Sequence, residues 1–294
     1  MIASVLPVIA PIFFCVGVGY CWKLLNQPFD TQMVSRLVMM VGAPALIIST
    51  LAKTPISIAS LHHMLWIVGL MLVIFLVAGA ILLRIFRLDV RSYIGTLAFP
   101  NIGNMGLPVC LFAFGEQGLA LALAVFMVMS VAHFSLGIFL FAGGSIVRVF
   151  TTNPIIYSVA AAMLMIYTGF ELPVWLDRSL DLIGSFTIPM MLITLGVSLA
   201  GLKIIYLRES LILALLRLVL GVAGGWAVVT ISGISGIERG VILVQAAMPT
   251  AVFNYMFAHQ YQRNPAQVAG MVLISTLISF VTLPWLLLWA EGAL

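Results

Sequence analysis

The sequence predicts an all-α integral membrane protein. Of its 294 residues, 63% are hydrophobic and 7% are charged, whereas an ordinary soluble domain is about 25% charged. The mean hydropathy is +1.23, and the apolar residues form runs near the roughly 20 residues that a helix needs to cross a bilayer. In water such a surface would expose large apolar patches and aggregate. These observations exclude a soluble enzyme and predict that the chain lies in the lipid bilayer, which is therefore an expected partner.

In chain order, apolar runs bounded by charged residues, proline or glycine predict ten transmembrane helices. The first five are expected at 3–22, 33–52, 64–86, 92–114 and 118–143. The second five are expected at 154–170, 180–201, 207–230, 238–259 and 266–290. The first run lacks the basic segment of a cleavable signal peptide, so we expect it to remain as the first helix. Prolines and glycines interrupt the fourth and ninth runs, which are therefore the least regular.

Charged or helix-breaking residues separate each run from the next. In the first half these are Lys23 with Pro28, Lys53 with Pro55, Arg84 with Arg91, and Gly115 with Glu116. In the second half they are Glu171 with Pro173, Lys203, Gly233 with Arg239, and Arg263 with Pro265. The pair Asn153-Pro154 opens the second half as its first helix.

Basic residues divide unequally between the two sides of the membrane, and Lys and Arg are retained on the cytoplasmic side. One side receives nine of them: Lys23, Arg36, Arg84, Arg87, Arg91, Arg148, Lys203, Arg208 and Arg263. The other side receives three: Lys53, Arg178 and Arg239. We therefore expect a multi-pass protein of the bacterial cytoplasmic (inner) membrane with both termini outside the cytoplasm. Since the basic residues are scattered singly, no nucleic-acid partner is indicated.

The two halves of the chain repeat. Pro44 and Pro189 lie midway along the second and seventh helices, and Pro100 and Pro249 interrupt the fourth and ninth. Each half has five helices, an odd number, so the second must enter the membrane from the opposite side. Inverted repeats are typical of transporters that work by alternating access. We expect the two repeats to interleave into one unit that contains a scaffold part and a transport part. The predicted repeats cover residues 1–145 and 150–294.

Polar residues cluster at the two interruptions. Residues 99–109 contain two prolines, two glycines and two asparagines, Asn101 and Asn104. If each helix unwinds at its proline, its second half begins near the bilayer midplane with free N–H groups and the positive end of its dipole. Two such ends suit an anion, which neutral amides can hold without a buried fixed charge. The polar groups in the matching stretch of the ninth helix are Gln245, Thr250 and Asn254.

The acidic residues fit an anionic substrate. All nine lie at or near helix ends, which counts against a cation substrate and against a proton relay built on buried carboxylates. The alternative is that the prolines and glycines only mark kinks and close packing. We favour that alternative for Pro44 and Pro189, and the anion site for Pro100 and Pro249.

Other polar residues in the helices have two interpretations each. Arg217, near the membrane centre, is either functional or satisfied by backbone carbonyls or by snorkelling. His133, with Ser130 close by in the sequence, either lines a cavity and titrates or is a hydrogen-bonded core residue. Ser49 and Thr194 follow Pro44 and Pro189 in the second and seventh helices. Their side chains either face the crossing or pack against neighbouring helices.

Several motifs together resemble the auxin efflux carrier family, which includes plant PIN auxin carriers and bacterial organic-anion carriers. The similar stretches are 99–109, 153–156 (NPII), 188–200 (IPMMLITLGVSLA), 248–251 (MPTA) and 275–284 (STLISFVTLP). The resemblance implies a fold like that of the bile-acid/sodium symporters. It implies two inverted five-helix repeats, broken helices four and nine crossing beside the substrate, external termini and a homodimer.

On this resemblance, the family's crossover proline and asparagine fall on Pro100 and Asn101, and its second crossover proline falls on Pro249. The chain departs from many relatives at Phe99 and at Asn104, whose extra amide is expected to alter substrate choice. The long loop that many plant members carry is here only about ten residues around Arg148, so control by loop phosphorylation is not expected.

We therefore expect a secondary transporter for a small organic anion, a mono- or dicarboxylate such as an auxin-like or malate- or malonate-like molecule. The alternative is a transporter-like sensor or binding scaffold without turnover. No phosphate loop, zinc-protease motif or paired intramembrane carboxylate indicates an enzyme. The expected substrate-binding residues are Pro100, Asn101, Asn104, Pro249, Thr250, Asn254, Ser49, Thr194, Ser130 and His133, with Asn101, Asn104 and Asn254 donating hydrogen bonds.

Coupling to an ion is open at this stage. Neutral oxygens near Gln245, Ser275 or Thr276 could hold Na⁺, His133 could carry H⁺, or transport could need no coupling ion. Arg217 is a candidate for supporting this region. No bound metal centre and no other cofactor are expected.

Overall fold

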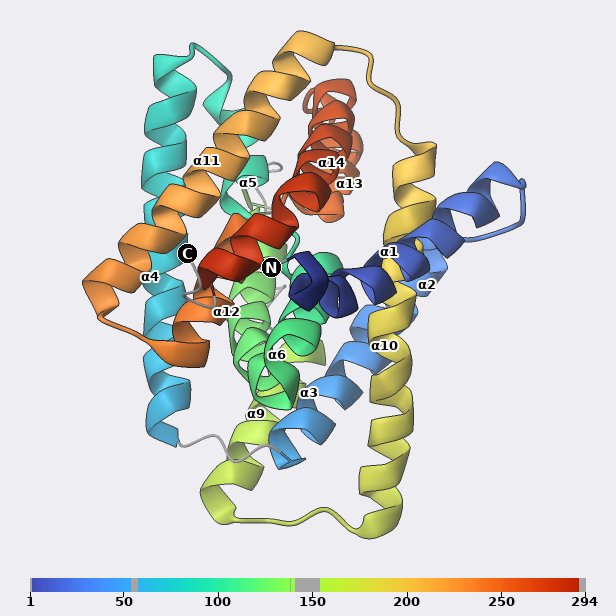
Figure 1. Ribbon diagram of the computed structural model, residues 1–294, viewed down its shortest axis with the longest axis vertical. Coiled ribbons are helices and arrows are strands. Elements are labelled where there is room, and N and C mark those ends of the chain that lie inside the picture. The colour runs from blue at the N-terminus through green and yellow to red at the C-terminus, as the bar shows by residue number, and fades with distance from the viewer. Residues whose placement is uncertain (1, 54–57, 138, 141–153, 291–294) are drawn as a thin grey trace.

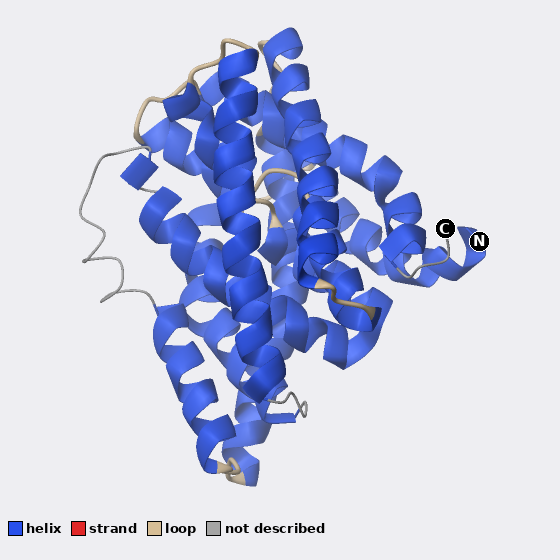
Figure 2. Ribbon diagram, turned by 90° about the vertical axis from the view of Figure 1, so that its left-hand side faces the viewer, coloured by secondary structure: helices blue, strands red, loops and turns tan. Residues whose placement is uncertain are grey.

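A computed structural model describes residues 2–53, 58–137, 139–140 and 154–290. Within these ranges every regular element is a helix, and the one β feature is an isolated antiparallel bridge between Pro100 and Thr250. Figure 2 shows this all-helical architecture. The expected junction between the two repeats, 145–150, lies outside the described residues.

In the first half, six elements precede the break after Ala98 and three follow it. They are α1 (Ile2–Leu24), α2 (Thr31–Leu37), η1 (Val38–Gly42), α3 (Ala43–Lys53), α4 (Ile58–Ile85), α5 (Val90–Ala98), η2 (Ile102–Gly106), α6 (Leu107–Ala132) and η3 (His133–Gly137). Elements α2, η1 and α3 form one continuous span. The π-helical turn η1 lies directly before Pro44, which has no amide hydrogen to donate to the carbonyl one turn earlier.

Local chemistry explains where these helices begin and bend. The Asp30 carboxylate accepts hydrogen bonds from the first-turn amides of Gln32 (2.9 Å) and Met33 (3.0 Å), so it caps α2. Asp89 caps α5 in the same way through Arg91 N. Gly115 has φ of 66° within α6, a left-handed backbone that glycine adopts readily, and it bends the chain where the fourth predicted run ends.

The second half also contains long helices and one interrupted helix. Its elements are α9 (Pro154–Thr168), α10 (Val174–Gly201), α11 (Leu207–Ser232), α12 (Gly236–Ala247), α13 (Val252–Gln260) and α14 (Pro265–Ala290). Pro189 lies inside α10 without ending it. Pro249 lies between α12 and α13, so this proline separates two helices.

Seven helices in the described ranges are long and apolar enough to cross a membrane. The difference from the ten predicted runs arises in three places. The runs 92–114 and 238–259 are each divided at an interruption, and α9 has only 15 residues. The second part of run 92–114 also continues through the bend at Gly115 into one span, Ile102–Gly137.

The helices pack in two groups. In one group, α10 packs against α1 and α3, and α3 packs against α9; in the other, α11 packs against α4, α12 and α14. Figure 1 shows α4 and α10 at opposite edges of the molecule. Between α1 and α10 the backbones are in contact, because a Cβ on Gly19 or on Gly196 would lie 2.0 Å from a carbonyl oxygen of the other helix.

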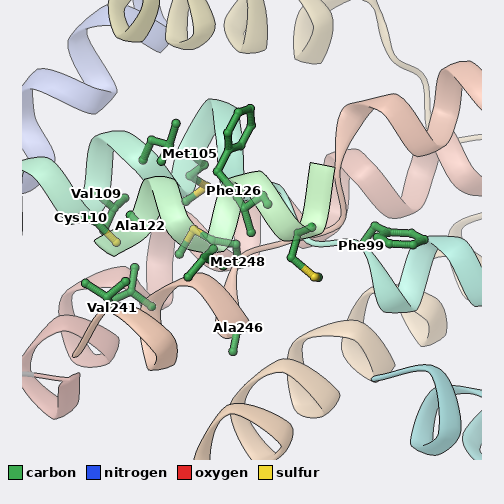
Figure 3. Packing of buried hydrophobic residues seen from close by; sticks show 14 of the residues in the cluster. Phe99, Met105, Val109, Cys110, Ala122, Phe126, Val241, Ala246 and Met248 are labelled. Carbon is green, nitrogen blue, oxygen red and sulfur yellow. The ribbon is translucent and has the colours of Figure 1, made fainter. Parts of the chain in front are cut away.

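The buried hydrophobic core extends through both halves of the chain and includes the contact between α6 and α12, and the outer surface is apolar. Figure 3 shows part of this core, including Val109 and Phe126 of α6 and Val241 of α12. Large hydrophobic side chains such as Trp66 and Leu182 are exposed. In lipid this exposure costs nothing, since hydrocarbon surrounds the outer face.

Candidate substrate site at the helix crossing

The two interrupted helices cross where both leave helical geometry. Helix α5 ends at Ala98 and α12 at Ala247, and the residues that follow are extended. Asn101 N–H donates to the Pro249 carbonyl at 2.7 Å, and Ala251 N–H donates to the Phe99 carbonyl at 3.1 Å. The two extended stretches therefore satisfy each other's backbone groups, which have no water to bond within a membrane.

Three polar side chains hold the crossing together: Thr250, Asn254 and His133. The Thr250 hydroxyl donates to the Thr96 carbonyl at 2.8 Å. The Asn254 amide donates to the Phe99 carbonyl at 3.0 Å and to Thr250 Oγ1 at 2.9 Å. Asn254 Oδ1 lies 2.8 Å from His133 Nε2, and the His133 ring stacks on Phe99 with centroids 4.4 Å apart. All polar atoms of the Asn254 side chain are thus bonded to protein.

Arg217 of α11 joins the ends of α5 and α12. Its side chain is fully buried, and it donates to the carbonyls of Leu97 (2.9 Å), Ala246 (2.5 Å) and Met248 (3.3 Å). These carbonyls lie at or just beyond helix C-termini, where the dipole is negative and the last carbonyls lack helical partners. Its guanidinium carbon also lies 4.8 Å from the centre of the Phe75 ring. Of the two interpretations of Arg217, the structure therefore places it in the arrangement that satisfies backbone carbonyls.

Two cavities lie beside the crossing. A small one of about 30 Å³ includes Pro100, Asn101, Asn104, Ser130 and His133 in its lining. A larger one of about 220 Å³ extends to the ends of α1 and α10, and its polar lining residues are Lys23, Thr31, Ser35, Asn104, Thr194, Ser198 and Tyr255. Asn104 and Phe253 line both cavities, so the two are neighbours.

The lining of these cavities is rich in hydrogen-bond donors. The helices that start at Ile102 and Val252 both contribute their first turns to it, with the positive ends of their dipoles. Asn101 Nδ2 and Thr194 Oγ1 are buried and have no hydrogen-bond partner among the described residues. An unpaired buried donor costs about 1–3 kcal/mol. The described lining of either cavity contains no Asp or Glu, so the site suits a ligand that accepts hydrogen bonds and carries negative charge.

Comparison with known proteins identifies the family of the chain. The sequence model of the family described as "Membrane transport protein" matches residues 4–148 and 144–287. The chain belongs to this family. It is the auxin efflux carrier family that the motifs resemble, so that prediction is confirmed.

Relatives over the whole length are described as transporters. An uncharacterized transporter of Methanocaldococcus jannaschii is 26% identical over 302 residues, covering 96% of this chain and 98% of the relative. The Rhizobium meliloti protein named "Putative malonate transporter" is 27% identical over 323 residues, covering 99% and 98%. An uncharacterized transporter of Methanothermobacter thermautotrophicus is 24% identical, covering 95% of both chains.

Several predicted residues of this transporter lie away from the two cavities. The Ser49 hydroxyl donates to Leu46 O at 3.3 Å and lies beside Gly184 of α10, so it sits in a helix contact. Ser275 and Thr276 donate to Val272 O at 3.3 and 2.7 Å, within their own helix. Thr250 and Asn254 stand among the groups that hold the crossing rather than in the lining of either cavity.

Gln245 of α12 has a fully buried side-chain amide. Within the residues that the structure describes, neither its Nε2 nor its Oε1 has a hydrogen-bond partner. The side chain lies against Gly106, where an added Cβ would be 2.1 Å from Oε1. Glycine at position 106 is therefore what allows the amide of Gln245 to lie against η2.

Sequence reasoning missed the residues at the open end of the larger cavity. Lys23, Ser35, Ser198 and Tyr255 come from four separate helices. Lys23 served in the sequence only as a marker of membrane orientation. No spacing pattern links it to Asn104, because the contact between their helices depends on tertiary packing.

Proposed function

We propose that this membrane transport protein is a secondary transporter that carries a small organic anion by alternating access at the helix crossing. One observation carries the proposal. Two buried donors have no partner among the described residues, Asn101 Nδ2 and Thr194 Oγ1, and they belong to residues that line neighbouring cavities without an Asp or Glu in the described lining. A bound organic anion would supply hydrogen-bond acceptors to these donors and lie at two positive helix ends.

Within this proposal the residues of the crossing have separate roles. Asn101 and Asn104 donate hydrogen bonds to the substrate, and Pro100 and Pro249 keep the helices interrupted. The remaining polar side chains support the geometry: Thr250, Asn254, His133 and Arg217. The cavities of about 30 and 220 Å³ are smaller than the roughly 300–1,000 Å³ of sites for drug-sized ligands. A small mono- or dicarboxylate fits this size, and the name of the Rhizobium meliloti relative supports malonate as a first candidate.

The architecture supports movement of one helix group against the other. We propose ten membrane segments in two inverted repeats, with α5/η2 and α12/α13 as the equivalent broken helices. The group of α1, α3, α9 and α10 serves as scaffold, and the group that packs around α11 carries the crossing. The larger cavity includes the exposed residues Lys23 and Gly201 in its lining. By the distribution of basic residues this end is cytoplasmic, so the conformation is inward-facing.

The proposal extends to the membrane and to the assembly. We place the protein in the cytoplasmic membrane as a homodimer with both termini outside. For coupling, the unpartnered Oε1 of Gln245 supports a Na⁺ site of neutral oxygens, and the His133 imidazole is a candidate H⁺ carrier. Imposing a Na⁺ gradient and a pH gradient separately across a proteoliposome distinguishes the two ions from uncoupled transport.

Counterflow in proteoliposomes tests the function. Vesicles loaded with malonate should accumulate labelled malonate through the wild-type protein, and Asn101→Ala should lower the initial rate by tenfold or more. A Ser49→Ala variant is the matched control, since its hydroxyl is buried in a helix contact outside both cavities. Equal rates for Asn101→Ala and wild type would overturn the site. Thermal stabilisation by carboxylates without any counterflow would favour a sensor or binding scaffold instead.

A further inference from the structure

The larger cavity has a single charged residue in its lining. Lys23, in the last turn of α1, is exposed at the open end of this space, and the other polar lining residues are neutral. Within the described part of the chain Lys23 forms no salt bridge. The ammonium group is therefore available to a mobile anion.

A second donor in the same cavity also lacks a partner. Thr194 of α10 is 6% exposed, and its hydroxyl has no hydrogen-bond partner in the described part of the chain. A lysine at a helix end is commonly explained by membrane orientation and by the helix dipole. Those explanations do not account for a buried, unpaired hydroxyl lining the same space as the lysine.

We propose that Lys23 and Thr194 form a second carboxylate subsite, and that the physiological substrate is a small dicarboxylate. This inference rests on the proposed function, in which the first carboxylate binds near Asn101 and Asn104. Asn104 lines both cavities, so one molecule can occupy both subsites. A substrate with carboxylates at both ends matches this arrangement of donors.

The charges of the two subsites explain the selectivity. Neutral amides and helix ends hold one carboxylate, but a second negative charge brought into the same cavity adds repulsion and loses hydration. An ammonium group at the open end offsets both costs for a dianion. A monocarboxylate leaves the Lys23 subsite empty and gains nothing from it.

The experiment compares malonate with malonamate, in which an uncharged amide replaces one carboxylate. Binding to purified full-length protein is measured by thermal shift and by titration calorimetry. The wild type should bind malonate about tenfold more tightly than malonamate, the effect expected of one charge-assisted hydrogen bond. Lys23→Gln should remove this preference, because it should weaken the binding of malonate about tenfold and change the affinity for malonamate less than twofold. Lys23→Arg should retain most of the preference for malonate.

Two further variants separate a direct contact from a general effect of charge. Lys203→Gln removes the same charge from an exposed position on the same predicted side, outside the cavity lining, and should leave both affinities unchanged. Thr194→Val should weaken malonate more than malonamate. The melting temperature of each variant without ligand verifies that it is folded.

Each outcome decides between the subsite and the wider function. Equal weakening of both ligands by Lys23→Gln, or no weakening of either, overturns the second subsite. A wild type that binds malonamate as tightly as malonate also overturns it and leaves the anion-transporter proposal standing. A wild type that binds neither ligand, nor any other mono- or dicarboxylate, overturns both.

Discussion

Two buried threonines near the crossing have opposite environments. The Thr250 hydroxyl donates to Thr96 O at 2.8 Å and accepts a hydrogen bond from Asn254 at 2.9 Å. The Thr194 hydroxyl, at 6% exposure, has no partner. Burial by itself therefore does not distinguish structural polar groups from ligand-binding ones. The difference lies in whether the protein supplies the hydrogen-bond partner.

The same contrast separates the polar side chains of the crossing. Arg217 donates to backbone carbonyls at the ends of both interrupted helices, and the Asn254 amide donates to Phe99 O and to Thr250 Oγ1. Asn101 Nδ2 has no partner among the described residues, and its residue lines a cavity. The paired groups keep the geometry, and the unpaired donor can bind a hydrogen-bond acceptor.

The strongest test of this contrast removes the guanidinium that joins the interrupted helices. Arg217→Met should lower the free energy of unfolding by about 3 kcal/mol or more, since three buried carbonyls lose their donor at about 1–3 kcal/mol each. Denaturant unfolding in detergent measures the change. Arg217→Lys keeps the charge but not the planar guanidinium, so its free energy of unfolding should lie between those of the wild type and Arg217→Met. A methionine variant as stable as wild type would show that these carbonyls do not need Arg217.

A smaller loss is expected at the paired threonine. Thr250→Val keeps the shape of the side chain but removes the donor to Thr96 and an acceptor for Asn254. We expect a loss of about 1–3 kcal/mol, the cost of leaving buried partners unsatisfied. The melting temperature should fall, and malonate binding by the folded fraction should change little. An unchanged melting temperature would contradict the structural role of Thr250.

The smallest stability effect, and one of opposite sign, is expected at the unpaired threonine. Thr194→Val replaces an unsatisfied buried hydroxyl with a methyl group of the same shape, so stability without ligand should stay equal or rise by about 1 kcal/mol. Carboxylate binding should weaken at the same time. Measuring melting temperatures with and without malonate checks both signs. A marked destabilisation would mean that Thr194 is satisfied by a protein group after all.

The sequence was sufficient to predict where the two helices are interrupted, but not which polar side chains around the interruptions are paired. Prolines and asparagines in 99–109 predicted a break, and the chain leaves helical geometry there and at Pro249. Proline acts locally, through its missing amide hydrogen and its ring, so its effect can be predicted from the sequence. Asn101 and Asn254 look alike in sequence. In the described part of the chain the side-chain nitrogen of Asn101 has no partner, whereas the side chain of Asn254 bonds to Phe99 and His133, which lie far away in the sequence.

Two other differences from the sequence-based predictions have different origins. Ser275 and Thr276 were candidates for an ion site, but their hydroxyls donate to Val272 O within α14, a local bond to the preceding turn. Lys23 indicated only membrane orientation, but it lines the larger cavity with Thr194. The surroundings of Lys23 depend on which helices pack together, which hydropathy and charge counts do not determine.

The sequence by itself determined that this chain is a helical membrane protein of the auxin efflux carrier family, interrupted at two prolines and poor in buried acid. Composition, proline chemistry and family motifs are properties of the linear chain, so they need no packing information. Only the tertiary structure decided that Arg217 satisfies carbonyls at both interrupted helices, and that Asn101 and Thr194 keep unpaired donors beside cavities. A hydrogen bond requires two groups within about 3 Å, and several of the groups that meet at the crossing come from opposite halves of the chain.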